Sequence, residues 1–193
     1  LARARIDPEA RPVHRLDRGT SGVVILARNA PAAAALFRAF RSRRVDKRYL
    51  ARVQGADIPD TLVIDVPVGP VPYPPLRPVS GARRDGRPAW TDVRVVGRDP
   101  GRDQAVVEAH PRTGRPQQIR IHLAWAGHPL VGEPLYGPGG LPRPVVPGTR
   151  PPVSGDIGFV LHAWQLDVAH PRTGALLHLV APPPDGLAGP DGG

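Results

Sequence analysis

One acidic residue lies between two arginines in residues 14–22, which read HRLDRGTSG. Asp17 follows Arg15 by two positions and directly precedes Arg18. Nearby cations favour the ionised form of a carboxylate, and the small residues that follow allow a bulky ligand to approach the backbone closely. The segment therefore predicts an ionised nucleophile or electrostatic group beside a docking surface. An aspartate that caps a turn between two solvated arginines fits the same residues.

Three further segments carry charged and aromatic residues in a characteristic order. They are DKRYLARVQG at residues 46–55, TGRPQQIRIHL at 113–123 continuing to GHPLVGEPLYG at 127–137, and LHA at 161–163. Together with residues 14–22, they resemble the RluA-type family of RNA pseudouridine synthases. The resemblance covers the chain from about residue 14 to residue 184. It depends on the order and spacing of all four segments, because any one of them alone would be a weak motif.

The resemblance implies roles for four residues. Asp17 matches the aspartate on which catalysis in this family depends, and Arg15 matches the arginine that helps to displace the target base from its stack. Tyr49 matches the tyrosine that packs against the flipped base, and Arg120 matches the arginine that pairs with the aspartate. The implied reaction isomerises a uridine of RNA: the bond from C1′ to N1 is broken and a bond from C1′ to C5 is made. It needs no cofactor.

The residue types suit that reaction. A stacked uracil cannot be rotated about its sugar, so it must first be flipped out, at a cost of roughly a few kcal/mol. Phosphate and stacking contacts from arginines and an aromatic side chain can offset this cost. When C1′ loses uracil it becomes electron-poor, and an ionised carboxylate can stabilise it by charge, attack it covalently or take a nearby proton. The sequence leaves these three roles of Asp17 open.

The charge of the chain favours a nucleic-acid partner. The formal net charge is +9, and nearly all of the positive charge is arginine, whose planar fork pairs with phosphate and stacks on bases. High-GC coding would explain the choice of arginine over lysine, but not the excess of basic over acidic residues. We expect a set of RNA-binding residues formed by Arg15, Arg18, Arg43, Arg44, Lys47, Arg48, Arg115 and Gln118.

Composition excludes several other kinds of site. The chain has no cysteine, so it has no disulfide and no thiolate metal site, and its seven histidines show no zinc-like spacing. It contains no phosphate-binding loop motif and no apolar run of roughly 20 residues, the length that crosses a bilayer. We therefore expect a cytoplasmic monomer that uses neither metal nor cofactor and does not contact a membrane.

The elements that would position the site follow from apolar periodicity and from helix and turn signals. The apolar run 23–27 predicts a strand, and Asn29 with Pro31 predicts a helix start, with Leu36, Phe37 and Phe40 on one face. Residues 48–54 alternate, which puts Tyr49 on an inward face. Further strands are expected at residues 61–66, 91–96, 104–109 and 176–180.

The string Ala-His-Pro-Arg-Thr-Gly occurs at residues 109–114 and again at 169–174. We interpret the two copies as similar hairpin turns, because their flanking sequences do not match. After the first copy, Pro116 can open a helix and Gly127 can end it. In this helix Ile119 and Leu123 would share a buried stripe, and Arg120 would lie on another face.

These elements predict a mixed α/β (α+β) domain over residues 1–184, with a mostly antiparallel central sheet, flanking helices and an RNA cleft across the sheet. Proline and glycine are concentrated at residues 67–78, 137–155 and 182–193. We expect the first two stretches to be surface loops and residues 185–193 to be a mobile tail. Because the Lys-Pro-x-Gly strand that usually opens this kind of domain is missing, and no S4-type RNA-binding domain precedes it, we expect the chain to be N-terminally truncated.

Two positions depart from the family pattern. Gln117 stands where the family usually has His, so a hydrogen bond can survive there but a titration cannot. Glu133 stands where the family usually has Asp. The expected substrate is a uridine of bacterial ribosomal or transfer RNA. Two alternatives stay open: an inactive RNA-binding protein of the same fold, and a glycoside hydrolase, which would need a positioned pair of carboxylates.

Overall fold

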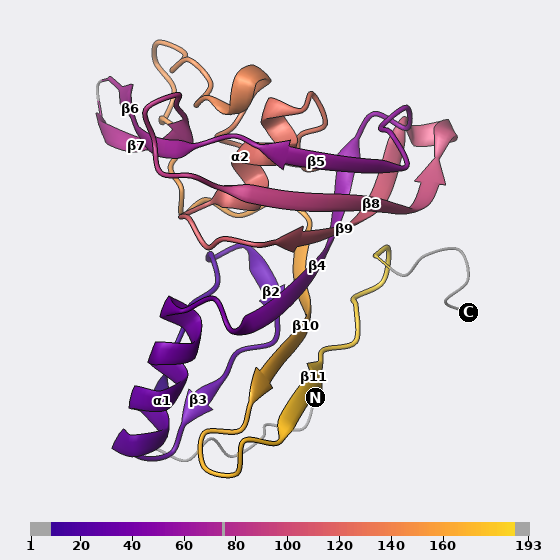
Figure 1. Ribbon diagram of the computed structural model, residues 1–193. Coiled ribbons are helices and arrows are strands. Elements are labelled where there is room, and N and C mark those ends of the chain that lie inside the picture. Colours follow the sequence, from indigo (N-terminus) through magenta and orange to yellow (C-terminus); the bar gives the residue numbers. More distant parts are fainter. Residues whose placement is uncertain (1–8, 75, 188–193) are drawn as a thin grey trace.

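The computed structural model describes residues 9–74 and 76–187 and is built around one seven-stranded sheet (Figure 1). β2 (Thr20–Gly22) runs parallel to one strand of this sheet, β10, and all other pairings in it are antiparallel. The expectation of a mixed, mostly antiparallel sheet is confirmed. The remaining strands lie in the order β11 (Leu176–Val180), β10 (Leu161–Ala169), β4 (Val45–Gln54), β9 (Gln104–Pro111), β8 (Trp90–Asp99) and β5 (Thr61–Asp65).

The other elements cover the two ends of the sheet. Figure 1 shows α1 and β3 beside β10 and β11 in the lower part, and α2 with β6 and β7 beside β5 and β8 in the upper part, while β4 runs through both. These elements are α1 (Ala30–Arg41), α2 (Gln118–Trp125), the two-stranded pairs β1 (Arg11–Pro12) with β3 (Leu26–Ala27) and β6 (Val68–Tyr73) with β7 (Leu76–Ala82), and the 3-10 turns η1 (Pro100–Arg102) and η2 (Pro138–Gly140).

α1 begins where the sequence predicts. The Asn29 side chain accepts a hydrogen bond from the Ala32 amide at 3.0 Å, as an N-cap does. Leu36 is buried and Phe40 is half-buried, stacked on His14 with 4.8 Å between ring centroids. Phe37 is 49% exposed, so it does not share the inward face with Leu36 and Phe40 as predicted.

The strands after α1 largely follow the predicted alternation. In β4, Ala51 and Val53 are buried in the main core, as expected of the inward face. β5, β8, β9 and β11 cover the four predicted stretches and differ only at their ends. The predicted strand 23–27 is formed only in its last two residues, β3, because pairing with β10 stops at Gly22 and pairing with β1 starts at Leu26.

Residues 67–78 are not the predicted loop, because most of them form the antiparallel pair β6–β7. A two-stranded ribbon has unpaired outer edges, so it tolerates prolines that a central strand would exclude. The register shifts between Val71 and Tyr73, where Pro72 lies. The stretch 137–155 holds only the short turn η2 in an otherwise irregular course, in agreement with the predicted loop.

The repeated Ala-His-Pro-Arg-Thr-Gly string adopts two different structures. The second copy lies at the turn between β10 and β11, as predicted, whereas the first connects β9 to α2 and is not a hairpin. α2 is also buried more completely than predicted, since every residue from Gln118 to Ala124 is buried. Leu187, assigned to the tail, is 1% exposed and packs with Leu50 and Val106. The rest of the predicted tail, 188–193, lies outside the described residues.

Gly22 is one of the most tightly packed positions of this fold. Its φ of 116° suits glycine alone, and an added Cβ would meet the backbone oxygen of Ala163 in β10. We expect Gly22→Ala to lower the free energy of unfolding by at least about 3 kcal/mol, the sum of backbone strain and overpacking. Gly174→Ala is the control: its φ of 74° is also positive but it faces open space, so about 1–2 kcal/mol is expected. Urea denaturation measures both, and equal losses would contradict the role of the β2–β10 contact.

Candidate active site

A cavity of about 650 Å³ opens between the turn after β1, the start of β4 and the segment that leads into α2. Its lining includes Asp17, Tyr49 and Arg120, which the sequence predicted to act together. Three other cations, Arg15, Lys47 and Arg115, line the same cavity, and Asp17 is the only acidic side chain among the lining residues. The volume is within the range of small-ligand sites. One carboxylate therefore faces a ligand-sized space surrounded by positive charge.

Asp17 lies in a tight turn held at both ends. The Thr20 amide donates to the Asp17 carbonyl oxygen at 2.8 Å, which closes the turn, and Thr20 is the first residue of β2. β2 then pairs in parallel with β10, Leu161 beside Thr20 and His162 beside Ser21. The small residues of the Gly-Thr-Ser-Gly stretch are needed for this close approach, and not only for access by a ligand.

His162, from the LHA segment, braces this pairing. Its Nε2 lies 3.0 Å from the Ala181 carbonyl oxygen and its Nδ1 lies 2.8 Å from the Ser21 hydroxyl. A carbonyl can only accept, so Nε2 carries the proton and Nδ1 accepts from Ser21. His162 is buried, 4% exposed, and absent from the cavity lining. It therefore supports the Asp17 turn from behind.

Tyr49 is brought to the same place by strand register. It pairs with Ala163 of β10 on one side and with Ala109 of β9 on the other. Ala163 is also the partner of Gly22, so the tyrosine lies across β10 from the end of the Asp17 segment. Burial, and to a lesser degree the negative charge of Asp17, raises the pKa of Tyr49 to about 12. Tyr49 is neutral at physiological pH.

Gln117 and Gln118 have different tasks. Gln117 adopts a left-handed conformation, φ 52°, and its Nε2 donates to Asp17 Oδ1 at 3.4 Å. Gln118 is 4% exposed; its Oε1 accepts from the Thr113 hydroxyl and the Arg115 amide, and its Nε2 donates to Trp90 O and Thr91 Oγ1. Both polar atoms of Gln118 are thus used within the protein, although the residue lines the cavity, and its contact with RNA stays a prediction.

The predicted pair between Arg120 and Asp17 is wrong. Arg120 is 0% exposed, and its Nε and Nη2 donate to Glu133 at 2.8 and 2.6 Å, while Nη1 donates to the Ser154 carbonyl at 3.0 Å. Among the described residues, no cation forms an ion pair with Asp17, whose side chain accepts a hydrogen bond from the side-chain amide of Gln117. The physical reason is burial, because a fully enclosed guanidinium requires a partner carboxylate that is equally enclosed.

Glu133 is that partner, and nothing in the sequence beyond its place in the GHPLVGEPLYG segment indicates the pairing. Its Oε1 also accepts from the amides of Leu135 and Tyr136 at 2.9 and 3.1 Å, so the carboxylate is fully coordinated. The Arg120 guanidinium carbon lies 4.2 Å from the ring centre of Phe159. The same ring packs on Gly19, where an added Cβ would lie 2.8 Å from its Cζ atom. Arg120 therefore reaches the Asp17 turn indirectly, through Phe159.

Burial also affects two basic groups of the lining. It lowers the pKa of Lys47, whose Nζ donates to the Thr113 carbonyl at 3.4 Å. It lowers the pKa of His14, whose Nε2 accepts from the Ile25 amide at 2.9 Å. The accepting Nε2 of His14 therefore carries no proton, and its hydrogen bond ties the segment after β1 to the residue before β3.

The predicted RNA-binding residues fall into three groups. Arg15, Lys47 and Arg115 line the cavity, and Arg43 lines a smaller cavity beside it. Arg18 and Arg44 are exposed and line neither cavity. Arg48 is turned to the other face of the sheet, where it pairs with Glu108 at 2.9 Å. Within the described residues, no group of three or more His, Asp or Glu could hold a metal ion, and no helix could span a membrane.

Comparison with known proteins gives consistent matches. A family model described as RNA pseudouridylate synthase matches residues 2–125. An RNA pseudouridine synthase of Synechocystis sp. is 39% identical over 93% of this chain and 60% of its own length. Ribosomal large subunit pseudouridine synthase D of Nitrosomonas europaea is 36% identical over 94% of this chain and 50% of its own. The chain thus spans about half to three fifths of the length of these relatives.

The fold has solved counterparts. Human RNA pseudouridylate synthase domain containing 1 superposes with a TM-score of 0.71 at 28% sequence identity, and the match covers 92% of this chain and 70% of that one. Human RNA pseudouridylate synthase domain containing 4 gives a TM-score of 0.67 at 27% identity.

Removing one partner of the buried Arg120–Glu133 pair should destabilise the fold. We expect Glu133→Gln to lower the free energy of unfolding by about 3–5 kcal/mol, because it leaves a buried guanidinium without its counter-charge. The matched control is Asp85→Asn, which breaks the exposed pair with Arg83 and should change little. Urea denaturation at neutral pH measures both, and a Glu133→Gln effect as small as that of Asp85→Asn would contradict this assignment.

The raised pKa of Tyr49 predicts a loss of stability in alkali. In the unfolded chain a tyrosine ionises near pH 10, about two pH units below Tyr49 in the folded protein. Its contribution is therefore complete below about pH 10 and is lost as the pH rises toward about 12. Urea midpoints at pH 8 and pH 11 should differ less for Tyr49→Phe than for the wild type. An equal decline in both proteins would show that Tyr49 titrates normally.

Proposed function

Because this chain belongs to the RNA pseudouridylate synthase family, we propose that it isomerises a uridine of RNA to pseudouridine in the cavity around Asp17. The observation that carries the proposal is the single carboxylate in a cavity that is also lined by the cations Arg15, Lys47 and Arg115. Positive charge attracts the phosphates on both sides of a target nucleotide. One negative group remains for the sugar carbon that becomes electron-poor.

In this proposal the roles follow from position. The flipped uracil packs on Tyr49, and Asp17 faces C1′ while the bond to N1 breaks. Because Asp17 Oδ1 accepts a hydrogen bond from the Gln117 amide, Oδ2 is the oxygen that faces C1′ of the sugar. The uracil then turns, C5 bonds to C1′ and loses its hydrogen, and N1 gains one, so the reaction is an isomerisation and consumes no cofactor. Arg15 holds the RNA at the rim of the cavity.

The same geometry argues against hydrolysis of a glycoside. Glycosidases normally place two carboxylates on either side of the scissile bond, about 5–10 Å apart. Asp17 is the only acid among the residues that line the cavity, and Glu133 is consumed by Arg120. The positive lining suits a polyanion better than a neutral sugar.

The substrate class is a finer part of the proposal. Relatives named for the large ribosomal subunit favour ribosomal RNA, with transfer RNA as the second candidate. We propose that the protein acts on this RNA as a monomer in the cytoplasm of a bacterial cell.

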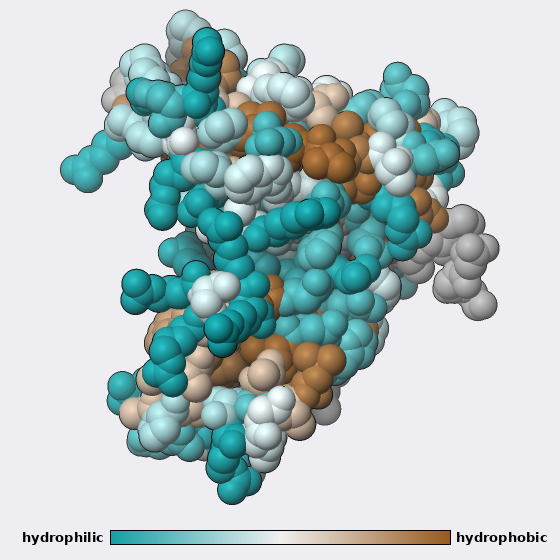
Figure 2. Space-filling model, viewed as in Figure 1, coloured by the Kyte–Doolittle hydropathy of each residue, from teal (hydrophilic) through white to brown (hydrophobic). Residues whose placement is uncertain are grey.

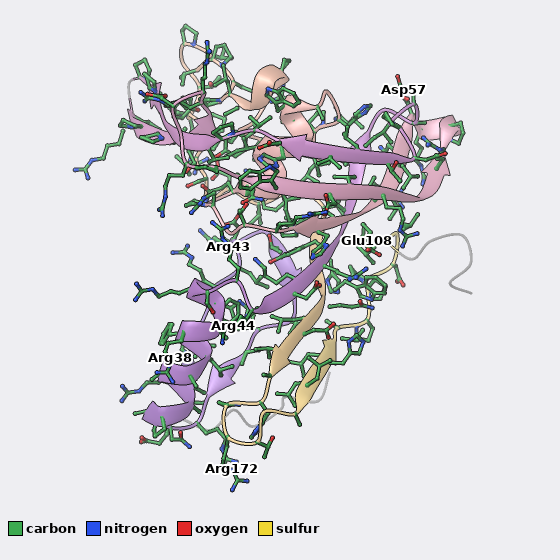
Figure 3. All side chains as sticks on the ribbon, in the orientation of Figure 1. Arg38, Arg43, Arg44, Asp57, Glu108 and Arg172 are labelled. Atoms are coloured by element: carbon green, nitrogen blue, oxygen red, sulfur yellow. The ribbon has the colours of Figure 1, made fainter. Side chains whose placement is uncertain are left out.

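Substitution of the carboxylate tests the activity. Asp17→Asn keeps the shape and removes the charge, so we expect product formation to fall below detection while RNA binding changes little. Release of tritium from 5-tritiated uridine in transcripts of large-subunit ribosomal RNA and of tRNA measures the reaction, because C5 must lose its hydrogen. The control is Asp57→Asn, an exposed carboxylate far from the cavity (Figure 3).

Two outcomes would contradict the proposal. Turnover by Asp17→Asn near the wild-type rate would remove Asp17 from the reaction. Wild-type protein that binds these RNAs but releases no tritium from either would indicate an inactive RNA-binding protein of the same fold.

A further inference from the structure

A second cavity, of about 350 Å³, adjoins the first and is used by no step above. We call it the Trp90 pocket; it is lined by Arg43, Val63, Trp90, Asp92, Arg112 and Thr113. Thr113 lines both cavities, so the two spaces share a wall. Figure 2 shows this face hollowed between the upper sheet and the lower part of the molecule, with hydrophilic side chains along the hollow.

One wall of the Trp90 pocket is apolar. In β8 the buried Thr91 and Val93 face α2, so Trp90 and Asp92 project from the opposite face. The paired residue of Asp92 in β5 is Val63, which is 67% exposed. An indole and an exposed valine therefore line the same wall of the pocket. Stacking of a nucleobase on an aromatic ring of this kind is tolerant of base identity.

The other walls are cationic. Arg112 is oriented by Asp92, 2.6 Å from its Nε, which leaves the terminal nitrogens of the guanidinium free to bind an anion. Arg43 has no ion pair or side-chain hydrogen bond with any other described residue. Figure 3 shows Arg43 at the end of α1, beside the gap below the upper strands. Burial, and to a smaller degree the positive charge of Arg43, lowers the pKa of Arg115 and of Lys47 in the first cavity, so the cations of the two cavities are close.

The backbone of Arg43 is held in a costly conformation. Its φ of 57° is left-handed, at the position after a helix where glycine is usual. A non-glycine residue there costs of order 1–2 kcal/mol, and such strain is often retained where the side chain has a use. The position fixes a cation at the mouth of the pocket.

Hydrogen bonds connect the Trp90 pocket to the wall of the first cavity. The Trp90 carbonyl accepts from the Arg112 amide and from Gln118 Nε2, and the Trp90 amide donates to the Thr113 hydroxyl. Trp90 is therefore fixed to the segment that enters α2 beside Gln117. A ligand that spans both cavities would therefore contact residues whose relative positions are fixed by these hydrogen bonds.

We propose that the Trp90 pocket receives a nucleotide of the same RNA strand that neighbours the flipped uridine, with its base against Trp90 and Val63 and its phosphate at Arg43 and Arg112. The proposal rests on the proposed function. An aromatic wall beside cations matches one unpaired nucleotide, and the shared wall at Thr113 places that nucleotide next to the target. Uridines with an unpaired neighbour would then be preferred over uridines within a continuous helix.

A thermodynamic cycle tests this contact. The probe is the fluorescein-labelled RNA AAUAA, together with versions that carry an abasic residue at one position next to the uridine, either 5′ or 3′. We expect Trp90→Ala to raise the Kd for AAUAA about tenfold and Trp90→Phe to raise it less than about threefold, because stacking on a ring is retained. For the RNA that lacks the contacted base, wild type and Trp90→Ala should bind equally.

Trp125→Ala is the control, since Trp125 is 48% exposed and lines neither cavity; its Kd should equal that of the wild type. An unchanged Kd for Trp90→Ala, or the same loss with all three RNAs, would overturn the proposal, because a purely structural effect does not depend on one base. If the wild type releases tritium in the activity assay but shows no coupling here, this proposal alone fails. If it neither binds RNA nor releases tritium, the proposed function fails with it.

Arg43→Gly tests the phosphate contact without straining the fold, because glycine suits the left-handed position. The slope of log K against log salt for AAUAA should become shallower by about 0.7, the value for one phosphate contact on a single strand. Arg172→Gln, at the distant β10–β11 turn in Figure 3, should leave the slope unchanged. Equal slopes for Arg43→Gly and the wild type would overturn the placement of a phosphate at Arg43.

Discussion

The buried ion pair of Arg120 with Glu133 holds together the parts that surround the cavity. It joins α2 to the segment before η2, and through the Ser154 carbonyl it also joins the long loop that leads to β10. The stacked ring of Phe159 continues the same contact to Gly19. Such a pair contributes less to net stability than to uniqueness of structure, since desolvation offsets much of the attraction. Its value lies in fixing the distance from α2 to the Asp17 turn.

The arginine that is paired inside the protein is therefore distinct from the cations that are available to a ligand. Arg120 is neutralised by its own carboxylate, whereas Arg15, Lys47 and Arg115 line the cavity without an ion pair to a described acid. Asp17 likewise keeps one oxygen free. A polyanion that enters the cavity would therefore meet cations that are not already paired. The single carboxylate would be left for the position where positive charge develops.

Much of the site could be predicted, because the motif segments lie on or beside strands whose pairing brings them together. Asp17, Tyr49 and Arg120 lie in separate segments, and the β2–β10–β4 pairing brings the first two to one place. The partner of Arg120 could not be predicted, since the choice between Asp17 and Glu133 depends on which carboxylate is buried with it. The role of Gln118 depends on four contacts from residues that no local pattern connects. No sequence pattern singles out Trp90, because the cavity that it lines forms only where β8 lies beside Arg43 and Arg112.

Strand register determines both how the sheet packs and which side chains face the cavity. Side chains alternate along β4, so a slip of one residue against β10 would turn Tyr49 to the face where Arg48 pairs with Glu108. Two features oppose such a slip. Ala51 and Val53 are buried in the core, and the hydrogen bond between His162 and Ser21 holds β2 against β10. Gly22 allows β2 to approach β10 closely enough for that hydrogen bond to form. The small residues after Asp17 are therefore needed for strand pairing, and the position of the carboxylate follows from the pairing that they permit.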